Sequence, residues 1–130
     1  LNDMPIGMTG HLLIPALDPE QCATLSPAVI GYIRGNIGFD GLLLTDDFSM
    51  GALSGDMGTR AGQALWAGCD VILHCNGERD EMAALANTVT SLTSDGVRRA
   101  DAALALRHGP KTPLRDLHDQ LKRLEDPIHA

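Results

Sequence analysis

A short apolar run sets the strongest limit on how this chain can fold. The run Leu42–Leu44 follows the turn residues Gly38–Gly41 and ends at Thr45, Asp46 and Asp47. A run that is this short, apolar at every position and bounded by turn residues indicates a strand buried on both faces, as in a parallel sheet. Burying two ionised carboxylates at its end costs free energy. In α/β proteins ligands bind at the carboxyl ends of parallel strands, so we expect the chemistry at this strand end.

Two further strand-like segments flank this run. One lies in the first half of Pro5–Ile14, before a loop at Pro15–Gln21, and the other is Asp70–Cys75. Helices are predicted at Ser26–Arg34 with Ser26 as N-cap, Thr59–Ala67, Arg79–Leu92, Val97–Arg107 with Asp95 as cap, and Leu114–Leu124 after Thr112-Pro113. The predicted order is therefore β-α-β-α-β-α-α-α.

Helical crossovers between short apolar strands are typical of parallel α/β architecture. The second and third strands start about 30 residues apart, which is the size of one βα unit. A complete eight-stranded barrel needs at least ~200 residues. With three predicted strands, residues 1–130 form either a small open sheet or the end of a barrel, with no second domain.

Charge and cysteine content restrict the partners. The net charge is -7 without a basic run, which argues against nucleic acid and anionic membranes. No apolar stretch reaches the length of a membrane span, and the N-terminal residues do not have the pattern of a signal peptide. Three cysteines without CxxC spacing indicate reduced thiols, as in a cytoplasmic protein. Because the chain does not begin with Met, we expect it to be a processed piece or a fragment of a longer protein.

Four segments resemble one enzyme family. They are MTGHLLIPALD (Met8–Asp18), TLSP (Thr24–Pro27), IRGNIGFDGLLLTDDFSMGAL (Ile33–Leu53) and ALWAGCDVILHCNG (Ala64–Gly77). They resemble the C-terminal third of glycoside hydrolase family 3, in its bacterial β-N-acetylglucosaminidase (β-hexosaminidase) branch, which works in peptidoglycan recycling. The resemblance spans about residues 4–107. It implies strands six to eight and the closing helices of the family's N-terminal catalytic (β/α)8 barrel, also called a TIM barrel.

The resemblance also implies roles for individual residues. The family's nucleophile is the Asp directly after the Ser or Thr that ends strand seven, which is Asp46 here. Met8 and His11, at the end of strand six, match positions that line the sugar subsite. The implied substrate is a muropeptide or chitooligosaccharide containing N-acetylglucosamine, and no cofactor is implied. The family's Lys-His pair and its His/Asp acid–base loop have no counterpart in these 130 residues.

Other interpretations remain open from the residues alone. Asp46 at a strand end could instead cap the following turn, and Asp47 is expected to be a structural partner of backbone N–H groups or of a neighbouring Lys or Arg. His74 and Cys75 make a poor metal pair, because they are adjacent and no third ligand has suitable spacing. The chain could also be a non-catalytic half-barrel folding or binding unit that pairs its open edges in an oligomer. A Mg²⁺-dependent phosphoryl-transfer site using Asp46 and Asp47 is a third hypothesis.

Overall fold

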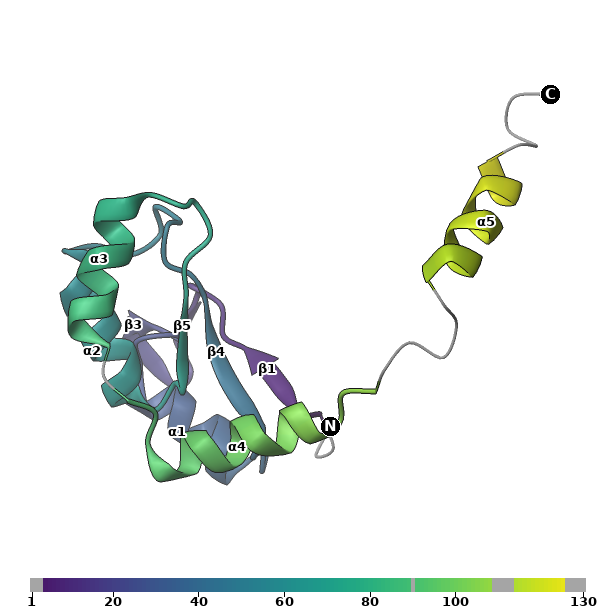
Figure 1. Ribbon diagram of the computed structural model, residues 1–130. Helices are drawn as coiled ribbons and strands as arrows, with labels where there is room; N and C mark the ends of the chain where they lie inside the picture. Colours follow the sequence, from purple (N-terminus) through teal and green to yellow (C-terminus); the bar gives the residue numbers. More distant parts are fainter. Residues whose placement is uncertain (1–3, 90, 109–113, 126–130) are drawn as a thin grey trace.

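The computed structural model describes residues 4–89, 91–108 and 114–125. Its main sheet has three parallel strands, β1 (Ile6–Met8), β4 (Leu42–Asp47) and β5 (Val71–Leu73), with β4 in the centre. Helices α1 (Pro27–Gly35) and α2 (Met57–Ala67) form the two crossovers, and α3 (Arg79–Thr88) follows β5 (Figure 1). The predicted α/β class is confirmed, and this order is consistent with part of a (β/α)8 barrel.

Alternation along β4 separates two faces of the sheet. Leu43 and Thr45 are buried against the helices, whereas Leu42, Leu44 and Asp46 are half-buried on the opposite face. The core between sheet and helices contains Ile30, Phe39, Leu43, Phe48, Met57, Ala61, Ala64, Ala67, Cys69 and Leu85. Gly7 of β1 has no room for a side chain, since a Cβ there would lie 2.9 Å from the Phe39 ring.

The ladder between β4 and β5 is irregular next to the two aspartates. Leu44 pairs with Val71 and Asp47 pairs with Leu73, so the ladder advances three residues on β4 and two on β5. The Leu73 N–H donates instead to the Thr45 hydroxyl oxygen, at 3.0 Å. Irregularities of this kind increase strand twist and redirect side chains, and they are common beside active sites.

Helix ends follow capping chemistry, with several corrections to the predicted bounds. Ser26 caps α1 as predicted, since its hydroxyl accepts from Val29 N–H. Helix α2 begins at Met57, before the predicted Thr59, because the Asp56 carboxylate accepts from the Thr59 N–H. An early cap of this kind adds residues to the first turn.

Later helix bounds also differ from the prediction. Helix α3 ends at Thr88, short of Leu92, because Val89 has an extended backbone with ψ of 114°. Helix α4 (Ser94–Ala105) is capped by the Thr93 hydroxyl, and the predicted cap Asp95 lies in its first turn. Helix α5 (Leu114–Glu125) is present, whereas its predicted Thr112-Pro113 start lies outside the described residues.

The predicted loop at Pro15–Gln21 is wrong, because most of it belongs to an antiparallel hairpin. Strands β2 (Leu13–Ile14) and β3 (Asp18–Cys22) pair with an irregular register. Backbone bonds from Leu17 N–H to Ile14 O and from Ala23 N–H to Leu12 O close it. The hairpin follows β1 in the chain, and its residues Leu13, Glu20, Gln21 and Cys22 line a hollow together with His11 and with residues 52–54 of the segment after β4.

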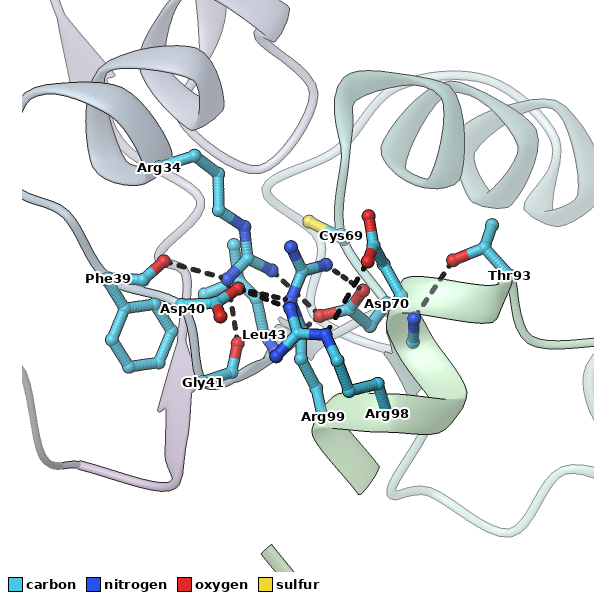
Figure 2. A network of polar contacts seen from close by, with 12 residues as sticks. Arg34, Phe39, Asp40, Gly41, Leu43, Cys69, Asp70, Thr93, Arg98 and Arg99 are labelled. Carbon is cyan, nitrogen blue, oxygen red and sulfur yellow. Dashed lines mark hydrogen bonds and ion pairs between the residues drawn. The ribbon is translucent and has the colours of Figure 1, made fainter. Parts of the chain in front are cut away.

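An ionic cluster holds α4 at the amino ends of the strands (Figure 2). The Asp70 side chain, 4% exposed, accepts from Arg34 Nη2 at 2.8 Å, Arg99 Nη1 at 2.9 Å and the Leu43 N–H at 2.9 Å. Arg99 and Arg98 also bind Asp40, just before β4. Because Asp40 and Asp70 precede their strands, α4 closes the end of the sheet opposite Asp46.

None of the helices in the described parts of the chain is long and apolar enough to cross a membrane. The thiols of Cys22, Cys69 and Cys75 are free. Burial raises the pKa of the Cys69 thiol to about 12, so that thiol stays protonated.

Candidate active site

Asp46 lies at the carboxyl end of the central strand, on the face that the helices leave open. Its side chain is half-buried, and its Oδ1 accepts from the Asp47 N–H at 2.9 Å. The hydroxyl oxygen of the neighbouring Thr45 accepts from the Leu73 N–H across the irregular ladder. Asp46 is therefore a carboxylate presented at a strand end, in a position where a substrate could approach.

Asp47 has the supporting contacts that the sequence predicts. Its Oδ1 accepts from the N–H groups of Ser49 at 2.9 Å and Cys75 at 3.0 Å, and its Oδ2 accepts from the Ser49 hydroxyl. These bonds, with the Ser49 hydroxyl first, hold the pKa of Asp47 below its usual value, although desolvation opposes them. Asp47 thus ties the end of β4 to the end of β5 through Cys75.

Met8 and His11 approach the same region from β1 and from the turn after it. Met8 pairs in register with Leu44, two residues before Asp46, and its side chain is 56% exposed. His11 Nδ1 is 2.9 Å from the Thr24 hydroxyl oxygen, and its Nε2 donates to the Asp47 carbonyl oxygen at 3.1 Å. The structure therefore brings Met8, His11 and the Asp46–Asp47 end of β4 together, and a contact with sugar stays a prediction for both residues.

Three residues that the sequence interpretation did not single out surround His11. The hydroxyl oxygens of Thr9 and Thr24 are 2.9 Å apart, and both residues are buried. The Phe48 ring, fully buried, meets the His11 ring edge-on with centroids 5.8 Å apart. Thr24 and Phe48 lie within the segments that carry the family resemblance, which is the signal that could have identified them.

A metal site finds no support in the described residues. Nowhere in residues 4–89, 91–108 and 114–125 do three or more His, Cys, Asp or Glu side chains converge as metal ligands. His74 binds Glu81, with Nε2 and Oε2 2.7 Å apart, and Asn76 donates to the same oxygen. The oxygens of Asp47 are already engaged with Ser49 and Cys75. The Mg²⁺ hypothesis therefore has no third carboxylate in this part of the chain.

The fold and site define a class of protein: a parallel α/β chain with a carboxylate at the end of its central strand. The family model for the glycosyl hydrolase family 3 N-terminal domain matches residues 2–104. The chain therefore belongs to glycoside hydrolase family 3, as the sequence resemblance predicted. The match identifies the N-terminal domain without locating the chain within it, so the predicted place in the C-terminal third stays a prediction.

Known proteins agree with this assignment. A β-hexosaminidase of Bordetella avium is 36% identical over 75 residues, 56% of this chain and 21% of that relative. One of Chromobacterium violaceum is 39% identical over 82 residues, 61% of this chain and 23% of the relative. A solved family 3 β-N-acetylglucosaminidase from Paenibacillus sp. str. FPU-7 matches 85% of this chain and 24% of its own, at 32% identity and a TM-score of 0.62. The chain thus spans about a quarter or less of these proteins.

Proposed function

We propose that the complete protein is a retaining β-N-acetylhexosaminidase in which Asp46 is the nucleophile. The observation that carries this proposal is the position of Asp46 at the open carboxyl end of β4, inside the segment that matches the family. Relatives named β-hexosaminidase and β-N-acetylglucosaminidase support the activity. The chain itself holds the nucleophile and part of the subsite.

Retaining hydrolysis requires a carboxylate that stays ionised and attacks the anomeric carbon. In the proposed first step, an Asp46 oxygen forms a glycosyl ester while the bond to the leaving oxygen breaks, and that oxygen takes a proton from a general acid. In the second step, water attacks the anomeric carbon, gives its proton to the same group acting as base, and releases Asp46. The Asp47 N–H donates to Asp46 Oδ1 at 2.9 Å and so orients the carboxylate that would attack.

The general acid has to come from outside these 130 residues. The His/Asp loop expected for this branch is absent from the sequence, and the chain spans about a fifth of its curated relatives. We therefore propose that upstream barrel elements, in the same or another chain, supply the acid and the remaining sugar ligands. The fragment alone should not turn over substrate.

The substrate proposal is a β-linked N-acetylglucosamine on a muropeptide or a chitooligosaccharide, with peptidoglycan recycling in the cytoplasm as the setting. These details rest on the sequence resemblance. Comparing hydrolysis of a muropeptide and of chitobiose by the complete protein tests them, because a preference of less than tenfold for the muropeptide would argue against a dedicated recycling role.

The test of the nucleophile uses Asp46→Ala and Asp46→Asn in the complete protein. Loss of a covalent nucleophile should reduce turnover of an aryl N-acetylglucosaminide by roughly 10⁴-fold or more, as for nucleophiles of other covalent mechanisms. Azide should restore part of the turnover of Asp46→Ala and give a glycosyl azide. Asp101→Asn, an exposed carboxylate of α4, is the matched control. Turnover within tenfold of wild type in both Asp46 variants would remove the assignment.

A further inference from the structure

We propose that His11 is a positioning residue that fixes the main chain next to the nucleophile, and this inference rests on the function proposed above. His11 lies in the turn after β1, and the hydrogen bond from its ring crosses to the end of β4. It acts on Asp46 through the backbone of the following residues. In this role it does not need to contact the sugar.

The hydrogen-bond partners of the His11 ring show which ring nitrogen carries a proton. A carbonyl oxygen can only accept, so the bond to the Asp47 carbonyl requires a proton on Nε2. Nδ1 then lies 2.9 Å from the Thr24 hydroxyl, which in turn lies 2.9 Å from the Thr9 hydroxyl. Both ring nitrogens are therefore occupied by protein groups. A sugar hydroxyl could bind His11 only by displacing one of them.

The peptide group between Asp47 and Phe48 is held from both neighbouring strands. Its carbonyl accepts from His11, on the β1 side, and its N–H donates to the Leu73 carbonyl of β5 at 2.9 Å. The regular β1–β4 contact ends before this point, with the Thr9 N–H donating to Leu44 O at 2.9 Å. The His11 side chain thus continues the connection between β1 and β4 where the main chain of β1 has turned away.

Buried neighbours keep the His11 ring in place. Thr24 and Phe48 are fully buried and Thr9 is 7% exposed. Phe48 packs edge-on against His11, and on Phe48 in turn lies Arg60, whose Cζ is 5.9 Å from the ring centroid. Arg60 also donates through Nη1 to the Leu53 carbonyl, at 3.2 Å, in the loop after β4. These contacts fix the segment that immediately follows the nucleophile.

The position of Asp46 depends on this peptide through one intervening residue. The Asp46 carboxylate is bonded to the Asp47 N–H, and the carbonyl of the same Asp47 is the group that His11 holds. A displacement of about 1 Å at a reacting group can cost on the order of 100-fold in rate. Releasing the Asp47 carbonyl should therefore lower the rate of the chemical step and leave substrate binding nearly unchanged.

The experiment compares His11→Asn with His11→Gln in the complete protein. The Gln amide N–H can reach the Asp47 carbonyl from where Nε2 lies, whereas the shorter Asn amide can reach only Thr24. We expect His11→Asn to lower kcat and kcat/KM together by about 10-fold to 100-fold, with KM within about threefold, because a transition-state geometry is lost. His11→Gln should stay within about fivefold of wild type. His118→Asn, on exposed α5, is the matched control.

A second readout follows the backbone directly. Amide hydrogen exchange of Phe48 should be at least tenfold faster in His11→Asn than in wild type, and His11→Gln should restore the protection. Should His11→Asn fail to fold, Thr24→Val replaces it, because it removes the partner of Nδ1 while leaving the ring; lower kcat at unchanged KM is again expected.

Three results would overturn the positioning role. A rise in KM of tenfold or more with unchanged kcat in His11→Asn would make His11 a ligand of the sugar. Activity of His11→Asn within fivefold of wild type would show that the bond to the Asp47 carbonyl is dispensable, and a loss in His11→Gln as large as in His11→Asn would show that this bond is not what the ring contributes. Full turnover by Asp46→Ala would remove the nucleophile assignment, but the amide exchange result would stand by itself, so the two failures are distinguishable.

Discussion

Adjacent aspartates of the same strand end have different environments, and the difference supports the separate roles proposed for them. Asp47 accepts three hydrogen bonds, two from Ser49 and one from Cys75, and both of its carboxylate oxygens are therefore engaged by protein groups. Asp46 lies on the open face and keeps a carboxylate directed away from the helical core. A reactive group at a strand end needs supporting contacts that hold it in place. Here the second aspartate provides that support.

The support from Asp47 should depend on pH. The hydrogen bonds hold the folded pKa of Asp47 below its ordinary value of 3.8, so the unfolded chain binds more protons as the pH falls through that range. The stabilisation is present above pH ~4 and is lost as the pH falls toward the folded pKa. Chemical unfolding of the complete protein should therefore show that, between pH 5 and pH 3, the free energy of unfolding falls more steeply for wild type than for Asp47→Asn.

Asp101→Asn controls for the change in net charge in that comparison, because its side chain is exposed on α4. If the free energies of unfolding of wild type and Asp47→Asn differ by the same amount at every pH, the Asp47 carboxylate does not contribute to stability through its ionisation.

At the scale of elements, an ionic cluster joins α4 to α1 and to the amino ends of β4 and β5. Asp70 receives donors from α1, β4 and α4, and it is almost fully buried. Asp40 binds Arg98 and Arg99, which lower its pKa to about 2, but both Asp40 and Arg98 are exposed. A buried carboxylate with three donors couples the elements more strongly than an exposed pair does.

Replacing Asp70 by Asn should therefore be costly. The change leaves the Arg34 and Arg99 guanidinium groups without their buried counter-charge, and breaking such a pair typically costs roughly 3–5 kcal/mol. Thermal or urea unfolding of the complete protein measures this loss. Asp40→Asn, which weakens only the exposed pairs, is the matched control and should have a much smaller effect. Equal effects of the two substitutions would show that the buried position of Asp70 is not what anchors α4.

The sequence predicts an element well when neighbouring residues determine it, and poorly when contacts with distant residues do. The apolar runs and the Ser26-Pro27 signal produce β4, β5 and α1 where they were expected. The hairpin was missed because β3 contains Pro19, has no alternation and is formed by bonds to residues before the turn. The caps at Asp56 and Thr93 were missed because several nearby polar residues compete for the same role.

The same argument applies to the site. Asp46 and Met8 were predicted from their places in matched segments, and the strand register brings them to one face. His11 bonds to one residue that is 13 positions away in the sequence and to another that is 36 positions away. No local sequence pattern predicts contacts of this kind. Contacts that depend on three strands meeting at one end become visible only in the folded chain.

At the scale of the whole molecule, both edges of the main sheet are open within the described residues. β1 and β5 are its edge strands, and Ile6 and Met8 of β1 are 49% and 56% exposed. An apolar hollow of about 200 Å³ beside β1 is lined by Met4, Gly7, Met8, Ile33, Ile37, Phe39 and Leu43. A second, of about 400 Å³, lies beside β5 and α3. Open apolar edges favour pairing with other strands.

The isolated 130-residue chain should therefore associate, whereas the complete protein should be monomeric at the same concentration if upstream elements pair with β1 and β5. Analytical ultracentrifugation measures both states. Ile6→Lys places a charge on the β1 edge and should weaken association of the isolated chain, because edge lysines oppose strand pairing. Trp66→Lys is the control, since it removes a larger exposed apolar side chain, 79% exposed, from α2 instead of from an edge strand. An isolated chain that remains a compact monomer would show that these edges need no partner, and would favour a small open-sheet unit over a section of a closed barrel.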